Sequence, residues 1–340
     1  MLESAYLDHH DDHPATNKEF NGDDLIEFKI AQFTDHVVQH PALLRCAASM
    51  KTLHLSATHR SSRSGSDVAL GPPRGMLITG LTGTGKSTIS RHYAEQFPRY
   101  DLEDRTVIPV LRVELPGQPR SNVIAEQLLV ALGDPLPKEG SGEFRLERAK
   151  KLFRACGVGL IIIDEIQHLT DNLDARTRDI AADTLKNLMN VGIPIVFIGL
   201  PSARSYFVRN QQLGRRCTPK IRLSPFTLGT DKDRREFMTL LKSLHQLLPL
   251  DGRSALIDES CVQSLYLASH GLLGQLTQLT EAALRIALTQ GSGPLTKEHL
   301  RIAFEETIFP DCGSARNPFH ERFNGKPLTG TDEPYNCLVS

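Results

Sequence analysis

The chain has 340 residues, of which 40% are hydrophobic and 23% charged, an ordinary composition for a globular protein. Its formal net charge of −1 gives no overall positive field, so any contact with nucleic acid must come from a local patch. The six cysteines are widely spaced without a CxxC pair, which favours reduced thiols over a disulfide framework. Neither a signal-peptide pattern nor an apolar run of about 18 residues occurs, so we expect a cytoplasmic protein with no membrane contact.

The N-terminal part divides into two segments. Residues 1–22 are polar and rich in Asp and His, and we expect a disordered tail there. A metal site in its Asp8–His13 cluster would need a scaffold that the segment does not supply, so a solvated tail is the simpler interpretation. Residues 23–73 have helical spacing up to His40-Pro41 and again from Ala42 to about Leu55. A linker rich in Ser, Arg and Gly follows them.

Residues 74–226 alternate between short apolar runs and amphipathic segments. We predict strands at 75–79, 107–113, 159–163, 193–198 and 220–223, and helices at 86–97, 122–132, 143–155 and 175–191. This alternation predicts an α/β domain with a five-stranded parallel sheet between helices. Residues 227–309 contain helical segments only, at about 231–247, 258–269, 272–290 and 296–306, and predict a small all-α domain. Residues 310–340 lack periodicity and predict a flexible tail.

A phosphate-binding loop follows the first predicted strand. The residues from Gly80 to Ser87 read GLTGTGKS and match GxxxxGK[ST] between a strand and a helix, the context that such a loop requires. Glycines let the backbone curl around phosphate, and loop N–H groups then face its oxygens. We therefore expect an ATP site with Mg²⁺, in which Lys86 reaches the β- and γ-phosphates and Ser87 ligates the metal. The predicted nucleotide contacts are Gly80, Thr82, Gly83, Thr84, Gly85, Lys86, Ser87 and Thr88.

An acidic pair, Asp164-Glu165, follows the apolar run Leu160–Ile163. The carboxyl end of a buried parallel strand would place Asp164 beside the phosphate loop, where it can hold Mg²⁺ through water. Glu165 is then positioned to orient and deprotonate an attacking water. The spacing from Lys86 to Asp164 leaves room for one intervening strand, as expected when the two strands are not neighbours in the sheet.

Two arginines, Arg215 and Arg216, follow a helix-like stretch and precede the last predicted strand. In a ring-forming ATPase this position meets the γ-phosphate held by the neighbouring subunit, and an arginine there neutralises charge in the transition state. The alternative is a pair of solvated arginines on a loop, and the sequence leaves both interpretations open.

The order of these motifs resembles that of AAA+ ATPases of the initiator type. More closely, the chain is similar to the TnsC/TniB family of transposition regulators, over about residues 25–306. The segments that carry this resemblance are Val113-Glu114-Leu115-Pro116, Leu132-Gly133, Leu160–Leu169, Ile193–Pro201, Gln212–Arg216 and Gly271–Leu276.

The resemblance implies an AAA+ fold whose all-α domain forms a lid, and a slow ATPase that works as a ring or filament of identical subunits on duplex DNA. It also implies a bacterial, DNA-associated protein that links a TniQ-like target-selection protein to a DDE transposase of the TnsB/TniA type. Some relatives work with a CRISPR effector complex. Two alternatives remain: a replication initiator or loader ATPase, which usually adds a DNA-binding domain after the lid, and an AAA ATPase of a secretion system.

Two positions depart from the family pattern. Leu200 stands where relatives often carry a polar sensor, and Gln275 stands where many AAA+ lids carry an arginine. Gln275 still belongs to the predicted nucleotide contacts. Because both changes remove polar contacts near the γ-phosphate, we predict slow hydrolysis, with nucleotide binding and assembly as the main use of ATP.

The resemblance also indicates where DNA would bind. Family contacts come from the segment after the second strand and from the loop before the next helix. Arg and Lys can neutralise phosphates and Ser and Asn can hydrogen-bond them, and repetition around an oligomer multiplies weak contacts. The matching residues in this chain are Arg120, Ser121, Asn122, Lys138, Ser141 and Arg145.

Overall fold

The computed structural model describes residues 22–38, 40–62, 75–117, 122–169, 175–291 and 293–338. Its centre is a five-stranded sheet in which every neighbouring pair is parallel, with the order β4-β5-β6-β1-β7. The strands are β1 Gly75–Gly80, β4 Val110–Glu114, β5 Leu160–Asp164, β6 Ile195–Gly199 and β7 Cys217–Leu223. As predicted, β1 and β5 are not neighbours, because β6 lies between them.

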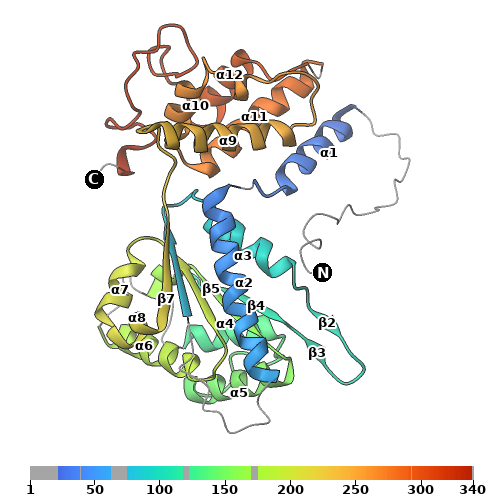
Figure 1. The fold of residues 1–340 in the computed structure, drawn as a ribbon, viewed down its shortest axis with the longest axis vertical. Coiled ribbons are helices and arrows are strands. Elements are labelled where there is room, and N and C mark those ends of the chain that lie inside the picture. The colour runs from blue at the N-terminus through green and yellow to red at the C-terminus, as the bar shows by residue number, and fades with distance from the viewer. Residues whose placement is uncertain are drawn as a thin grey trace.

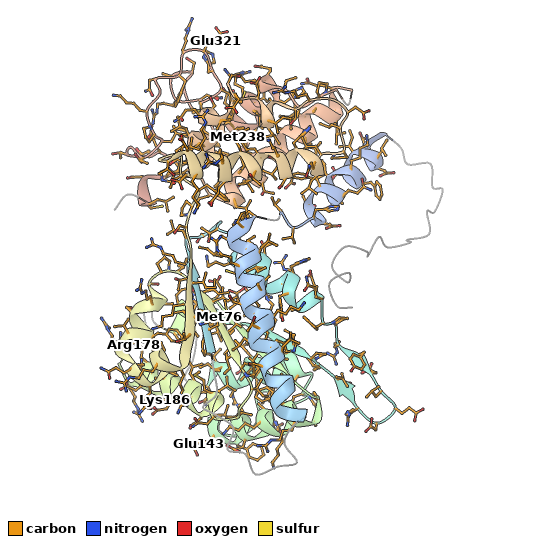
Figure 2. The ribbon with its side chains drawn as sticks, in the orientation of Figure 1. Met76, Glu143, Arg178, Lys186, Met238 and Glu321 are labelled. Atoms are coloured by element: carbon orange, nitrogen blue, oxygen red, sulfur yellow. The ribbon has the colours of Figure 1, made fainter. Side chains whose placement is uncertain are left out.

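Helices cover both faces of the sheet, as the nearly continuous apolar runs of its strands require. Side chains alternate along β1, so Met76 and Ile78 join one apolar cluster and Leu77 joins the other. Met76 is fully buried under α2 (Figure 2). The first face is covered by α2 (Pro41–Ser62) and α3 (Lys86–Glu95). The second is covered by α4 (Val123–Leu132), α5 (Gly142–Ala155), α6 (Ala175–Met189), α7 (Ala203–Arg209) and α8 (Gln211–Arg216).

A helical lid lies beyond the carboxyl ends of the strands (Figure 1). It consists of α9 (Asp231–Leu247), α10 (Val262–Ser269), α11 (Leu273–Thr289) and α12 (Lys297–Thr307), with a short 3₁₀ helix at Ala255–Ile257. Thr230 and Thr296 cap α9 and α12 through capping boxes. The first described helix, α1 (Gly22–Asp35), packs on α11 and so lies against the lid.

Three predicted boundaries differ from the structure. The predicted strand 107–113 is divided: β3 (Thr106–Val107) pairs antiparallel with β2 (Tyr100–Asp101) in a separate hairpin, and only β4 enters the main sheet. Pro109 separates the two pieces because it has no N–H to donate to a ladder. The helix α2 continues to Ser62 instead of ending near Leu55, and β7 begins at Cys217, which pairs with Gly75.

The prediction of a flexible tail after residue 309 is wrong for residues 310–338. Phe319, Leu328 and Tyr335 are buried and belong to the apolar cluster of the lid. Arg316 forms an ion pair with Glu333, with Nε and Oε1 2.5 Å apart. The segment is ordered by these individual contacts and by turns, and such a structure leaves no periodic pattern in a sequence. The predicted tail at 1–22, with its Asp and His cluster, lies outside the described residues except for Gly22, which begins α1.

Candidate active site

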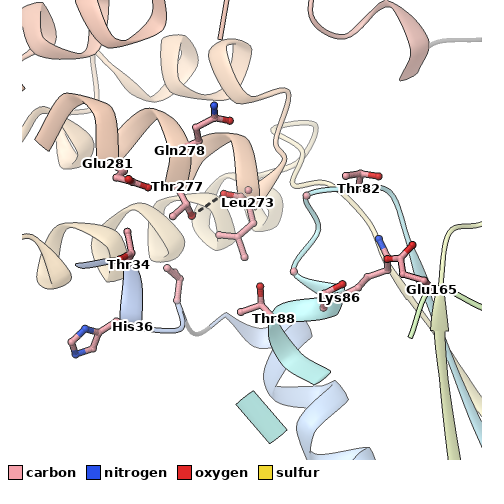
Figure 3. A pocket seen from close by; sticks show the side chains of 15 residues that line it. Thr34, His36, Thr82, Lys86, Thr88, Glu165, Leu273, Thr277, Gln278 and Glu281 are labelled. Carbon is pink, nitrogen blue, oxygen red and sulfur yellow. Dashed lines mark hydrogen bonds between the residues drawn. The ribbon is translucent and has the colours of Figure 1, made fainter. Parts of the chain in front are cut away.

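A cleft of about 400 Å³ opens between the carboxyl end of the sheet and the lid (Figure 3). Three parts of the chain contribute to it: the phosphate loop with the start of α3, the end of α1 with the segment after it, and the first three turns of α11. Glu165 also lines it, at the end of β5. The predicted contacts Thr82, Gly83, Gly85, Lys86, Ser87 and Thr88 all lie on its wall.

The phosphate loop has the backbone that its glycines permit. Gly83 and Gly85 have φ of 79° and 87°, in the left-handed region that side chains disfavour. A Cβ on Gly80 would lie 2.6 Å from the carbonyl oxygen of Leu223, so this position must also stay small. Thr84 is buried and donates its hydroxyl to the carbonyl of Leu81 at 2.7 Å, so it supports the loop from behind.

The lid touches the phosphate loop directly. Gly274, in the first turn of α11, donates its backbone N–H to the carbonyl oxygen of Gly83 at 2.7 Å. A Cβ on Gly274 would lie only 3.0 Å from the Cα of Gly83, so a side chain would push the lid away. The lid therefore covers the cleft, and its position depends on this contact between α11 and the phosphate loop.

Lys86 is 6% exposed and donates to the carbonyl oxygen of Leu81, 2.7 Å from its Nζ. Burial lowers the pKa of Lys86, while the charges of Glu165 and Asp164 oppose that shift. Figure 3 shows Lys86 and Glu165 close together at one end of the cleft. Among the described residues the ammonium group thus has a single hydrogen-bonded oxygen, which leaves donors for phosphate oxygens.

Asp164 is completely buried, and each of its oxygens has a partner. Oδ1 accepts the backbone N–H of Glu165 at 3.0 Å, while Oδ2 accepts the Ser90 hydroxyl at 3.0 Å and Nη2 of Arg112 at 3.0 Å. Arg112 lies on the neighbouring strand β4 and also donates Nε to Ser90. The sequence reasoning missed Ser90 and Arg112. A cation inside the apolar run Val110–Val113 was the available signal, because a buried charge needs a partner.

Glu165 has a φ of 58°, which is uncommon for a residue other than glycine, Asn or Asp. Its Oε2 accepts a hydrogen bond from Nε2 of Gln167 and lies 3.7 Å from Nε2 of His168. Both partners belong to the 3₁₀ helix Ile166–Leu169, which begins immediately after Glu165. The strained backbone and these contacts together aim the carboxylate into the cleft.

The residues present fit a magnesium nucleotide. The loop places backbone N–H groups, a buried lysine and the N-terminus of α3 along one wall, which suits a polyanion. The hydroxyl of Ser87 and the carboxylate of Asp164 are oxygen donors of the kind that Mg²⁺ prefers. Since both oxygens of Asp164 already accept hydrogen bonds, this carboxylate suits contact with the metal through water.

The far end of the cleft is formed by residues that no motif indicated. Thr34, His36 and Val38 line this end from one side, and Thr277, Gln278 and Glu281 line it from α11. Figure 3 shows Thr34 opposite Glu281. These groups lie about 240 residues apart in sequence, and only the packing of α1 on the lid brings them together. Gln275, which was predicted to contact the nucleotide, is half-buried on α11 and is not among the residues that line the cleft.

Arg215 and Arg216 end α8 and do not line the cleft of their own chain. Arg216 donates Nη1 to Oδ1 of Asn190 at 2.7 Å. The sequence contains no Asp or Glu from residue 184 to residue 230. In this segment α7, α8 and β7 carry six cations without an ion pair among the described residues, and we call them the basic face: Arg204, Arg209, Arg215, Arg216, Lys220 and Arg222.

The structure brings the described members of the predicted DNA set together at the α4–α5 loop. Arg145 is 15% exposed, lies 3.5 Å from Glu126 and donates to the carbonyls of Gly140 and Lys138. Lys138 is 79% exposed and lies 4.0 Å from Glu126. Ser141 caps α5, and Asn122 packs beside Gly142. Arg120 and Ser121 lie outside the described residues. Arg145 thus braces the loop, which leaves Lys138 as the more accessible cation.

The family model described as "Bacterial TniB protein" matches residues 68–228. Over these residues, just under half of the chain, the sequence is similar to the TniB family. The predicted resemblance to transposition regulators of the TnsC/TniB type is thereby confirmed. The match extends from before β1 to just after β7, so it includes the phosphate loop, the Asp164-Glu165 pair and the basic face.

Solved structures with a similar fold include AAA+ proteins named ORC and CDC6. The ORC2 protein of Aeropyrum pernix (ADPNP-ADP complexes) is 17% identical with a TM-score of 0.55, over 81% of this TniB-type chain and 71% of its own. The ORC1 protein of the same organism, in complex with DNA, is 18% identical with a TM-score of 0.56, over 82% and 69%. CDC6P from Pyrobaculum aerophilum is 15% identical with a TM-score of 0.55, over 82% and 71%. These likenesses establish the predicted AAA+ α/β fold.

No curated protein sequence matches the chain. In the part of the chain that the structure describes, no three His, Cys, Asp or Glu residues gather as metal ligands. The helices of this part include none with the length and apolar character needed to cross a membrane.

Proposed function

We propose that this TniB-type protein is an ATP-dependent regulator of DNA transposition that assembles on target duplex DNA. It links a TniQ-like target-selection protein to a DDE transposase, and ATP hydrolysis controls the assembly and its release. The observation that carries the proposal is the TniB match to residues 68–228, because this same segment forms the phosphate loop and the acidic strand end.

In this proposal the cleft binds Mg-ATP, with the triphosphate on the phosphate loop. Lys86 contacts the phosphates, while Ser87 and Asp164 hold Mg²⁺, which neutralises phosphate charge when it is bound. Arg112 and Ser90 keep the carboxylate of Asp164 in place. Glu165 orients the attacking water and accepts its proton. The far end of the cleft, between the segment after α1 and α11, is the place for the nucleoside.

Assembly is proposed to complete the site. Arg215 and Arg216 lie outside their own cleft, and the basic face around them forms no ion pair with the described residues of its own chain. An unneutralised group of six cations favours an anionic partner, and the triphosphate held by a second copy is one. The β2–β3 hairpin carries Asp101, Glu103 and Asp104, of which Asp104 pairs with Arg105; its remaining carboxylates offer the opposite charge on a second copy.

Contact with DNA is proposed at the α4–α5 loop. Lys138 is its accessible cation, and Asn122 and Ser141 are polar neighbours in the described part of the loop region. A single such contact is weak, but an array of subunits repeats it along the duplex. We expect binding that falls steeply with salt and has little sequence preference, as a filter-binding assay would measure.

The decisive experiment is electron microscopy of the protein with duplex DNA and a non-hydrolysable ATP analogue. We expect rings or filaments with both ligands and none with Lys86→Ala. Co-purification with a transposase and a TniQ-like protein from flanking genes then tests the partner assignment. A protein that binds Mg-nucleotide yet stays a single subunit on DNA would contradict the proposal, and so would the absence of nucleotide binding.

A further inference from the structure

A buried glutamine links the carboxylate of Glu165 to the end of β6. Gln167 is 3% exposed and lies between them. Its Oε1 accepts the backbone N–H of Leu200 at 3.0 Å, and its Nε2 donates to Oε2 of Glu165. A backbone N–H can only donate, so the amide oxygen must face Leu200 and the NH₂ group must face Glu165. The amide therefore has a single orientation that satisfies both neighbours.

The glycine at position 199 leaves room for the Gln167 amide. A Cβ on Gly199 would lie 2.6 Å from Oε1 of Gln167 and 2.8 Å from Cγ2 of Ile166. No side chain fits at that position unless Gln167 moves. Gly199 is also the last residue of β6 and pairs with Thr79 beside the phosphate loop, so the contact reaches the centre of the site.

Leu200 supplies no polar side chain at the position that follows β6. We propose that Gln167 is a positioning residue that supplies the polar side chain missing at Leu200. It holds the Glu165 carboxylate in the cleft by a hydrogen bond, and its own amide is fixed by the backbone N–H of Leu200. The inference rests on the proposed ATPase function and adds to it the group that orients its base. Nε2 of His168 lies 3.7 Å from the same carboxylate oxygen.

The hydrogen bond from the N–H of Leu200 to Gln167 also connects Glu165 to the basic face. The chain runs from Leu200 into α7 and α8, and α8 ends at Arg215 and Arg216. A shift of this segment when the arginines meet a second copy would move the N–H on which Gln167 depends. The same hydrogen bond thus makes the orientation of Glu165 sensitive to subunit contact.

Two variants test the positioning role. Gln167→Met keeps the volume and removes both hydrogen bonds, whereas Gln167→Glu keeps the acceptor for Leu200 and removes the donor to Glu165. We expect both to lower the single-turnover rate of ATP hydrolysis on duplex DNA by roughly 10- to 100-fold, since a hydrogen bond to a charged group is lost. Nucleotide affinity should stay within about twofold, because the phosphate loop is untouched. Unchanged hydrolysis, or a loss matched by equal loss of nucleotide affinity, would overturn the inference.

A second route leaves Gln167 in place. Gly199→Ala should displace its amide and reduce hydrolysis to a similar extent. The matched control is Gly117→Ala, near the same 3₁₀ helix, where among the described residues a Cβ would come closest to Cε1 of His168, at an ordinary contact distance of 3.8 Å. In a Glu165→Gln background, Gln167→Met should cause no further loss of hydrolysis. If the two losses multiplied instead, Gln167 would act through a group other than Glu165, which would contradict the inference. If the wild-type protein itself fails to bind or hydrolyse ATP, the proposed function fails; if only the variants behave as wild type, this inference alone fails.

Discussion

The charges around the cleft and the charges of the basic face are organised in opposite ways. In the cleft, the buried Asp164 is paired with Arg112 and Ser90, and Glu165 is held by Gln167. On the basic face, six cations have no ion pair among the described residues. A site whose charges are satisfied internally can be formed by one chain. Cations that form no ion pair within the described part of their own chain gain most from an anionic partner.

The largest expected effect comes from removing the central cation of the cleft. Lys86→Ala should weaken Mg-ATP binding by at least about 100-fold and abolish assembly on DNA, because Lys86 is the only lysine or arginine that lines the cleft in the described chain. Isothermal titration and electron microscopy measure the two effects. Lys150→Ala, in an ion pair on α5, is the control that should bind as wild type.

The second effect separates chemistry from binding. Glu165→Gln should lower hydrolysis by about 10²- to 10⁴-fold while ATP still binds, because the amide cannot accept the proton of water. Assemblies on DNA should then last longer, as their dissociation after dilution would record. Faster dissociation than in the wild type would mean that hydrolysis does not control release.

The third effect sharpens the contrast with the basic face. Arg216→Ala should leave ATP binding by the single chain within about twofold, since Arg216 does not line its own cleft. Turnover that depends on assembly should fall at least about 100-fold. A surface arginine of the lid, Arg234, provides the control Arg234→Ala. Equal loss of turnover in dilute, unassembled protein would show that Arg216 acts within its own subunit.

The smallest effect concerns stability. Arg112→Leu leaves the buried Asp164 without its cation and should lower the free energy of unfolding by roughly 2–3 kcal/mol, less than for a fully buried pair because Arg112 is 21% exposed. Urea denaturation measures it. Arg105→Ala, which removes an exposed pair with Asp104, should change stability by less than about 1 kcal/mol. If both variants changed the free energy of unfolding by similar amounts, the pairing of the buried Asp164 would matter no more than an exposed ion pair.

Much of the fold could be predicted because its signals are local. Apolar runs that alternate with amphipathic segments indicated the parallel sheet, and the GxxxxGK[ST] pattern indicated the loop that lines the cleft. Errors occurred where local signals are weak. Pro109 divides one predicted strand, and the segment after residue 309 is ordered by single contacts such as that of Arg316 with Glu333.

The sequence by itself determined the order of the elements, the phosphate loop and the acidic strand end, because hydrophobic period and glycine placement act over a few neighbouring residues. Only the tertiary structure decided which side chains meet: Arg112 with Asp164, Gln167 with Leu200, and Gly274 with Gly83. Such contacts join residues that are 33 to more than 190 positions apart, and they follow from how the sheet and the lid pack together. Packing of this kind has no periodic signature in the chain.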